Sequence, residues 1–147
     1  MNKLYIEENI SSNDLIKRIA YDYNLSNYVV LKTKNGKPYF KGNNIYFNIS
    51  NKDNITVAVT SSKPVGIDIE RLIFKSSVVK HFFSKNEQEI IKNSLDKELD
   101  FTTIWVKKEA YIKYLGLNIT SIRKIDTTKI TGFTIKKYKE YIIGIKE

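Results

Sequence analysis

Residues 65–70 read Val-Gly-Ile-Asp-Ile-Glu, an alternation of apolar and polar side chains that predicts a strand. Because side chains two positions apart share one face of a strand, Asp68 and Glu70 should point the same way. Ile67 and Ile69 should then turn into the core. Two neighbouring carboxylates repel each other, and a bound Mg²⁺ removes that repulsion because hard cations prefer carboxylate oxygens. A solvated acidic strand end is the plainer alternative, and this stretch alone leaves both open.

A second stretch, residues 105–113, reads Trp-Val-Lys-Lys-Glu-Ala-Tyr-Ile-Lys and predicts part of a helix. Trp105, Glu109 and Lys113 are spaced by four positions and so share one helical stripe. A surface Glu–Lys pair beside a core tryptophan would explain this stretch by itself. Packed over the strand end, however, Glu109 would supply a third carboxylate and Lys113 would meet phosphate oxygens. Mg²⁺ commonly shares its coordination shell with substrate phosphates, so the two stretches together predict an enzyme that moves a phosphorylated group.

The rest of the chain predicts an α+β fold with antiparallel strands and one principal long helix. An amphipathic helix is expected from Ser12 onward. Its buried residues should be Leu15, Ile19 and Tyr23. The long helix should end at Gly116, a residue type that favours helix ends. The expected ranges are 98–115 for that helix, 28–33, 45–49, 55–60 and 65–70 for strands, and 133–145 for a terminal hairpin.

Two titratable residues between these stretches need separate treatment. Ser84 and Glu87 form a capping-box pattern ahead of a helix, but the Glu87 carboxylate could instead take a proton in catalysis. The sequence leaves both roles open. His81 is the only histidine and no cysteine accompanies it, so a transition-metal site is not expected. We expect His81 to be a partly exposed helix-end residue and not a catalytic base.

The composition is that of a small folded protein with excess positive charge. Of its 147 residues, 41% are hydrophobic and 28% are charged, and the formal net charge is +9. No cysteine is available for a disulfide, no apolar run approaches the roughly 20 residues of a membrane span, and residues 1–12 lack the apolar core of a signal peptide. A cytoplasmic location without membrane contact is therefore expected. A basic nucleic-acid-binding domain would fit the charge but would not explain the three acids.

Both stretches resemble the two signatures of the 4'-phosphopantetheinyl transferases. Other segments also agree with this family: residues 36–39 (Gly-Lys-Pro-Tyr), 47–50 (Phe-Asn-Ile-Ser) and 82–87 (Phe-Phe-Ser-Lys-Asn-Glu). The resemblance covers residues 36 to about 116 and is to the surfactin-synthetase-activating type. The shorter trimeric carrier-protein synthases lack the two upstream segments. The family's small polar residue after the tryptophan is replaced here by Val106, and its histidine after the Phe-Asn-x-Ser segment by Asn51.

The resemblance implies a fold of two similar small α/β lobes related by a pseudo-twofold axis, together one compact unit. Residues 1–64 would form an abridged, nucleotide-contacting N-terminal lobe, and residues 65–147 would carry the metal site. The implied reaction is Mg²⁺-dependent transfer of 4'-phosphopantetheine from coenzyme A to a serine of an apo acyl or peptidyl carrier protein, releasing 3',5'-ADP. Such carriers serve fatty acid, polyketide and nonribosomal peptide synthesis. A monomer without nucleic-acid partners is expected; the alternative is a weak family member that only binds coenzyme A or a carrier protein.

Carried over by position, the resemblance also assigns roles to individual residues. The metal-binding acids would be Asp68, Glu70 and Glu109. The coenzyme A contacts would be Lys37, Pro38, Ser50, Asn51 and Lys113. The catalytic residues would be Glu109, Lys113 and Glu87, with Glu109 or Glu87 as the general base. Lys113 would contact the pyrophosphate and draw off its charge.

Overall fold

The computed structural model describes residues 2–147 and consists of two three-stranded antiparallel sheets, a short hairpin and four α-helices. The strands are β1 (Lys3–Glu8), β2 (Val30–Lys32), β3 (Pro38–Phe40), β4 (Tyr46–Lys52), β5 (Ile55–Ser61), β6 (Gly66–Arg71), β7 (Phe133–Tyr138) and β8 (Tyr141–Lys146). The α-helices are α1 (Ser12–Asp22), α2 (Ser76–Phe82), α3 (Lys85–Lys92) and α4 (Lys97–Leu115). Two 3₁₀ turns follow α4, at Ile119–Lys124 and Thr127–Lys129. This confirms the predicted mixture of helices and antiparallel strands.

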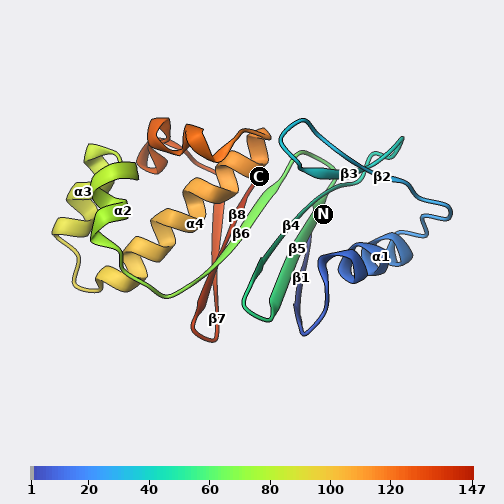
Figure 1. Ribbon diagram of the computed structural model, residues 1–147, viewed down its shortest axis with the longest axis horizontal. Coiled ribbons are helices and arrows are strands. Elements are labelled where there is room, and N and C mark those ends of the chain that lie inside the picture. Colours follow the sequence, from blue (N-terminus) through green and yellow to red (C-terminus); the bar gives the residue numbers. More distant parts are fainter. Residues whose placement is uncertain (1) are drawn as a thin grey trace.

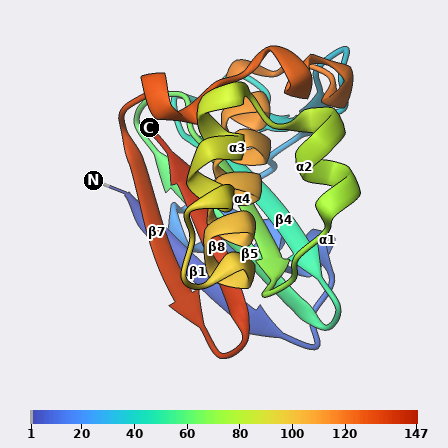
Figure 2. The same cartoon turned by 90° about the vertical axis from the view of Figure 1, so that its left-hand side faces the viewer.

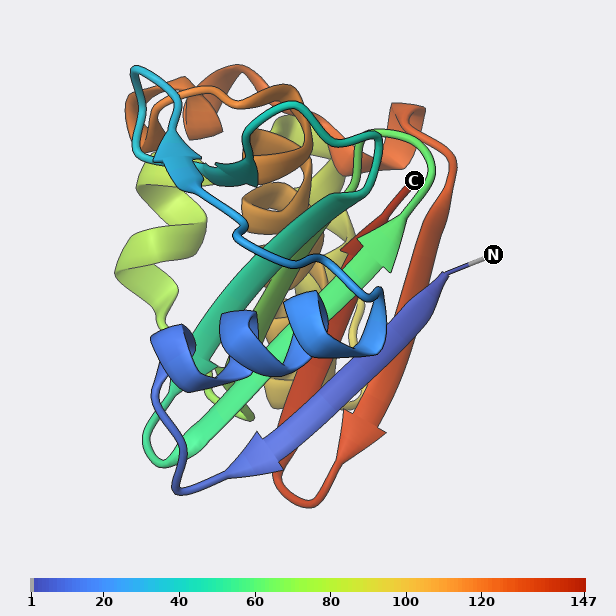
Figure 3. The same cartoon turned by 90° about the vertical axis from the view of Figure 1, so that its right-hand side faces the viewer.

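The elements stack in four layers, helix–sheet–sheet–helix (Figure 1). One sheet has the strand order β1-β5-β4 and the other β6-β8-β7. Helix α1 lies across the outer face of the first sheet (Figure 3), and α4 covers the outer face of the second, with α2 and α3 beyond it (Figure 2). The first sheet falls within residues 1–64 and the second within 65–147, the division that we continue to propose for the two lobes.

A shared apolar core fills the space between the two sheets. Alternate residues of β5, β6 and β8 point into it: Ile55, Val57, Val59, Ile67, Ile69, Tyr141, Ile143 and Ile145, all buried. Because strand side chains alternate between faces, the intervening residues of β6 and β8 face α4 instead. The predicted inward direction of Ile67 and Ile69 and the predicted terminal hairpin are therefore confirmed. The hairpin was expected to have one buried face, but β8 is buried on both faces because it is the central strand of its sheet.

Helix α1 covers the other face of the first sheet with the predicted residues. Leu15 and Ile19 are fully buried against this sheet. The N-cap is Ser11, one residue earlier than Ser12, and its side chain accepts a hydrogen bond from the Asp14 amide. Tyr23 lies just past the last turn, and its hydroxyl is 2.7 Å from the Thr60 hydroxyl. The partly buried Tyr23 thus anchors the end of the helix to the sheet.

Two glycines let α4 lie unusually close to the second sheet. A Cβ atom on Gly66 would fall 2.0 Å from the Ala110 carbonyl oxygen, and one on Gly144 would fall 2.9 Å from a methyl of Val106. Val106 is completely buried there, which explains an apolar residue at this position. As predicted, α4 ends at Gly116, whose φ of 66° is left-handed. The close contact brings the side chains of β6 next to those of α4.

Three elements were not predicted, and each has a weak sequence pattern. In β1 both faces are partly buried, Tyr5 under α1 and Leu4 and Ile6 toward the other sheet, so a simple alternation is lost. β3 has three residues, and α2 has seven with no fully buried residue and no side-chain cap. No helix within residues 2–147 is long and apolar enough to cross a membrane.

Candidate active site

The predicted acids of β6 and α4 line one hollow between the two halves of the chain. The hollow has a volume of about 380 Å³ and is walled by β4, β6 and α4. Its lining residues are Ile49, Ser50, Asn51, Lys52, Asp68, Ile69, Glu70, Trp105, Glu109 and Lys113. The strand face that carries Asp68 and Glu70 and the helical stripe that carries Glu109 and Lys113 thus meet in one place, as their spacings predict. We call this space the acid hollow.

Asp68 is the most deeply placed of the three acids. The residue is 8% exposed, and its side chain accepts hydrogen bonds from the Ser50 hydroxyl at 3.0 Å and from the Lys113 ammonium at 2.9 Å. Burial raises the pKa of Asp68, while the charge and hydrogen bond of Lys113 act in the opposite direction. Two elements therefore hold the Asp68 carboxylate by hydrogen bonds: β4 through Ser50 and α4 through Lys113.

Glu70 lies further out and is paired with a lysine from β4 of the first sheet. Its Oε1 is 3.0 Å from the Lys52 ammonium and also accepts from the Arg71 amide at 2.9 Å. The ion pair lies at the rim, where solvent weakens the attraction between the two charges. Lys52 had no predicted role, since an isolated strand lysine carries no sequence signal of its own.

Glu109 is the acid without a partner. Within residues 2–147, no hydrogen bond or ion pair holds its carboxylate. Burial raises its pKa to about 7, and the negative charges of Asp68 and Glu70 contribute to the increase. Lys113 lowers this pKa but does not offset the increase. The charge of Glu109 is thus uncompensated, in a hollow that already contains two carboxylates.

The three carboxylates that line the acid hollow are suitable ligands for Mg²⁺, but in this structure they do not surround one point. Among residues 2–147, no three carboxylates or imidazoles stand close enough together to hold a metal ion as they are. Two of the three acids are instead paired with Lys113 and Lys52. Carboxylate oxygens are the ligands that Mg²⁺ takes. Burial and the negative charges of Asp68 and Glu70 both raise the pKa of Glu109, and a divalent cation would favour its charged form.

Asn51 lies at the edge of the acid hollow beside the start of α1. Its side-chain amide donates to the Ser12 hydroxyl at 3.4 Å, and the residue is exposed. Ser50 and Asn51 both line the hollow, as predicted for coenzyme A contacts. Their predicted roles as ligand contacts stay predictions.

Lys37 and Pro38 lie outside the acid hollow. The Lys37 ammonium donates to the carbonyl oxygens of Val65 at 2.9 Å and Lys113 at 2.7 Å. Lys37 lines a different hollow of about 660 Å³, beside Tyr39, Tyr114 and the end of α4. Pro38 begins β3, where it pairs with Lys32. The family resemblance implied a nucleotide contact for Lys37, and no sequence pattern predicted its two carbonyl partners.

Glu87 occupies the helix cap that the sequence predicted. Its side chain accepts from the Ser84 amide at 2.9 Å while the Ser84 hydroxyl accepts from the Glu87 amide at 3.1 Å, a complete capping box. Glu87 is fully buried, forms an ion pair with Lys108 at 2.6 Å and accepts two further hydrogen bonds from Thr127. It is not among the residues that line the acid hollow. His81, on the last turn of α2, is exposed as expected.

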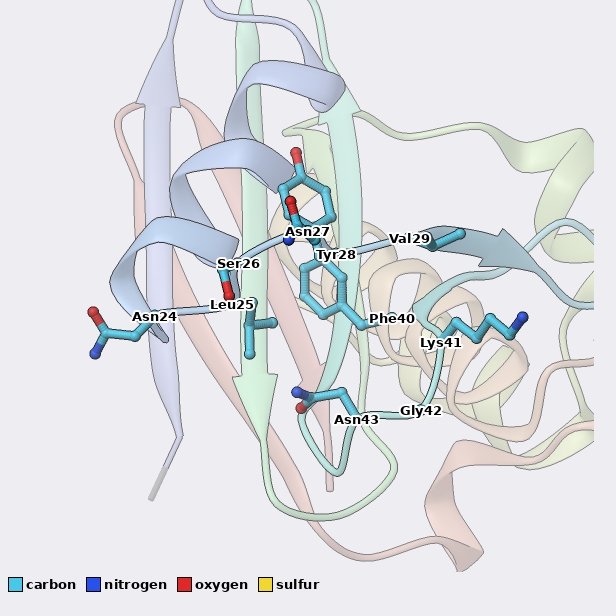
Figure 4. Close-up of a pocket in the computed structure, with 10 residues that line it drawn as sticks. All are labelled: Asn24, Leu25, Ser26, Asn27, Tyr28, Val29, Phe40, Lys41, Gly42 and Asn43. Carbon is cyan, nitrogen blue, oxygen red and sulfur yellow. The ribbon is translucent and has the colours of Figure 1, made fainter.

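A further hollow lies at the far end of α1 and contains none of the predicted site residues. Its volume is about 340 Å³, and it is lined by residues 24–29 and 40–43 (Figure 4). Tyr28 and Phe40 meet edge to face there, with ring centres 5.5 Å apart. The lining includes amides and one lysine but no acid, so this space lacks the chemistry of the acid hollow.

Comparison with known proteins identifies the family. A family model described as the 4'-phosphopantetheinyl transferase superfamily matches residues 64–145, which include β6, α4 and the terminal hairpin. The chain belongs to this superfamily. All three acids and Lys113 lie within the matched residues. The resemblance drawn from the two signature stretches is therefore confirmed.

Curated relatives carry the same name. The chain is 38% identical over 98 residues to 4'-phosphopantetheinyl transferase gsp of Aneurinibacillus migulanus, which covers 63% of this chain and 41% of that protein. It is 34% identical over 101 residues to HetI of Nostoc sp., covering 62% and 43%. It is 33% identical over 78 residues to Sfp of Bacillus subtilis, covering 51% and 35%. The aligned part thus spans about two fifths, or less, of these relatives' lengths.

Proposed function

We propose that this chain transfers the 4'-phosphopantetheine group of coenzyme A to a serine hydroxyl of an apo acyl or peptidyl carrier protein, with release of 3',5'-ADP. The observation that carries the proposal is the acid hollow, in which Asp68, Glu70, Glu109 and Lys113 meet. Membership of the 4'-phosphopantetheinyl transferase superfamily supports the same reaction. The names of the curated relatives support it as well.

Asp68, Glu70 and Glu109 are the residues that would hold Mg²⁺. When bound, the ion would supply a Lewis acid that neutralises charge on the pyrophosphate of coenzyme A. A cation should stabilise the charged form of Glu109 more than that of the other two acids. The Glu109 carboxylate has no ion-pair partner within residues 2–147, and its pKa is raised to about 7. Ser50 holds one oxygen of Asp68 through a hydrogen bond of 3.0 Å and so fixes the direction of that carboxylate.

Lys113 is the cation that would stabilise the transferring phosphate. An ammonium group carries three donors, and one of them is used on Asp68 at 2.9 Å. The side chain is 29% exposed and lines the acid hollow, so its remaining donors can face phosphate oxygens. A fixed positive charge placed where negative charge develops lowers the barrier to phosphoryl transfer.

The serine hydroxyl of the carrier protein must lose its proton as it attacks phosphorus, and Glu109 is the better placed base. Glu109 lines the acid hollow, and no hydrogen bond or ion pair within residues 2–147 holds its carboxylate, so one of its oxygens could take the proton directly or through a water. Glu87 stays the second candidate, although Ser84, Lys108 and Thr127 already occupy its carboxylate. The net charge of +9 would steer an acidic carrier protein toward the hollow.

The direct test incubates the chain with coenzyme A, Mg²⁺ and an apo carrier protein and looks for the phosphopantetheine adduct by mass spectrometry. We expect the adduct with Mg²⁺ and none with excess chelator. A Glu89→Gln variant, changed at an exposed glutamate of α3, is the matched control and should keep wild-type activity. Coenzyme A binding by calorimetry without any adduct, across several carrier proteins, would favour the alternative of a binding module.

A further inference from the structure

The turn between β2 and β3, residues 33–37, reaches from the first half of the chain to the C-terminal end of α4 (Figure 1). Two of its side chains make hydrogen bonds there. The Asn35 amide donates to the Gly116 carbonyl at 2.7 Å. The Lys37 ammonium donates to the carbonyls of Lys113 at 2.7 Å and Val65 at 2.9 Å. The turn is thus bound to the backbone of the second half at three points.

The two carbonyls that Lys37 joins belong to the two elements that build the acid hollow. Val65 immediately precedes β6, which carries Asp68 three residues later. Lys113 lies in the last turn of α4, four residues after Glu109. One ammonium group therefore links the start of the acid-bearing strand to the end of the acid-bearing helix.

A lysine is chemically suited to this position. The last carbonyls of a helix lack partners within the helix and carry the negative end of its dipole, so a cation is favourable there. Burial lowers the pKa of Lys37 to about 8, and no carboxylate within residues 2–147 pairs with its ammonium. Removing an ammonium from water is costly unless its donors are used, and these two carbonyls use two of the three.

The same geometry argues against a contact between Lys37 and a phosphate in the acid hollow. Lys37 does not line the acid hollow, and its ammonium points at backbone atoms between the two elements. One donor of the ammonium stays free, but Lys37 is not among the residues that line the acid hollow, so a phosphate bound there would meet the ammonium only after it left these carbonyls.

We infer that Lys37 is a positioning residue, which holds β6 and the end of α4 at the spacing that lets Lys113 reach Asp68. The inference rests on the proposed function, because that spacing matters for transfer only if the acid hollow is the active site. It replaces the nucleotide contact that the sequence implied for Lys37. Pro38 then has a structural role, because it starts β3 directly after this turn, and no contact with a ligand is needed to explain it.

The test compares Lys37→Met with a matched control, Lys34→Met. Methionine keeps the length and apolar stem of lysine but has no donor, and Lys34 is an exposed lysine of the same turn. Hydrogen exchange reports on the structure without any activity. Gly116 and Leu117 are the reporting amides, since they donate to the carbonyls of Lys113 and Ile112. We expect faster exchange at both in Lys37→Met and no change in Lys34→Met.

The dissociation constant of coenzyme A and the kcat of transfer are the second and third measurements. A positioning role predicts that Lys37→Met lowers kcat on the order of tenfold or more, while the dissociation constant of coenzyme A changes by less than about twofold. Lys37→Arg can still donate to both carbonyls and should recover part of kcat and slow the exchange again. Circular dichroism establishes that each variant is folded.

Two results would overturn the inference. One is wild-type exchange at Gly116 and Leu117 in Lys37→Met. The other is a loss of coenzyme A affinity that accounts for the whole loss of transfer, which would make Lys37 a ligand contact. If the wild-type chain transfers nothing, the proposed function fails, yet the exchange measurement still decides whether Lys37 holds the two elements together.

Discussion

Lys108 and Glu87 form an ion pair of 2.6 Å in which both side chains are completely buried. The Lys108 ammonium also donates to the Ile125 carbonyl, and Thr127 donates to the second Glu87 oxygen. Lys108 directly precedes Glu109, and the two face different sides of α4: Lys108 contacts Glu87, and Glu109 lines the acid hollow. The pair therefore fastens α4 to α3 and to the 3₁₀ turns behind the site.

Lys108→Met is expected to destabilise the protein by about 3–5 kcal/mol, because it leaves the Glu87 carboxylate buried without its counter-charge. Denaturant unfolding followed by circular dichroism measures this loss. Lys107→Met, at a partly exposed neighbour, should cost far less. A Lys108→Met variant as stable as the wild type would show that the pair contributes little.

Glu87→Gln separates the structural and catalytic roles of this residue. Glutamine keeps the capping geometry but loses the charge opposite Lys108. We expect a lower free energy of unfolding and, at temperatures where the variant is folded, near-normal transfer. A large loss of kcat with unchanged stability would instead make Glu87 the general base.

The raised pKa of Glu109 predicts a pH-dependent stability in metal-free buffer. Between its ordinary pKa of 4.5 and about 7, the folded state binds more protons at this site than the unfolded state. Stability should therefore fall as pH rises through this window, by up to about 3 kcal/mol. Glu109→Gln should remove that part of the fall. Parallel pH profiles for the two proteins would contradict the assignment.

Mg²⁺ should reverse this loss of stability. A ligand that binds only the folded state raises its stability by mass action, so Mg²⁺ should raise Tm at pH 8 in the wild-type chain. The increase should be much smaller in Asp68→Ala, Glu70→Ala and Glu109→Ala, and transfer should be greatly reduced in each. Full activity of Glu109→Ala in the presence of Mg²⁺, or indifference of the wild type to chelator, would refute the metal site.

Asn51→His tests whether this edge of the acid hollow contacts coenzyme A. Imidazole titrates near pH 6.5, so the variant should bind coenzyme A more tightly than the wild-type chain does, and the difference should be larger at pH 6 than at pH 8. The gain should be on the order of 1 kcal/mol, because Asn51 is exposed. Calorimetric titration of both proteins at the two pH values measures it. Unchanged affinity at both would show that Asn51 does not face the ligand.

The sequence predicted those features that depend on regular spacing. The alternation at residues 65–70 and the four-residue spacing from Trp105 to Lys113 indicated which side chains line one hollow, and Ser84 and Glu87 indicated the start of a helix. The partners of these residues were not predictable. Lys37, Lys52 and Lys108 find their oxygens across 28, 18 and 21 positions of the chain, where the arrangement of the layers decides the contact and no local pattern records it.

The apolar layer between the two sheets has a consequence for dissecting the molecule. Both halves contribute one whole face to it, β5 from the first half and β6 and β8 from the second. A cut in the link between Ser61 and Gly66 would expose an uncovered sheet face on each fragment. Separate fragments should therefore aggregate or stay unfolded, and should regain structure only when refolded together, in proportions close to one to one.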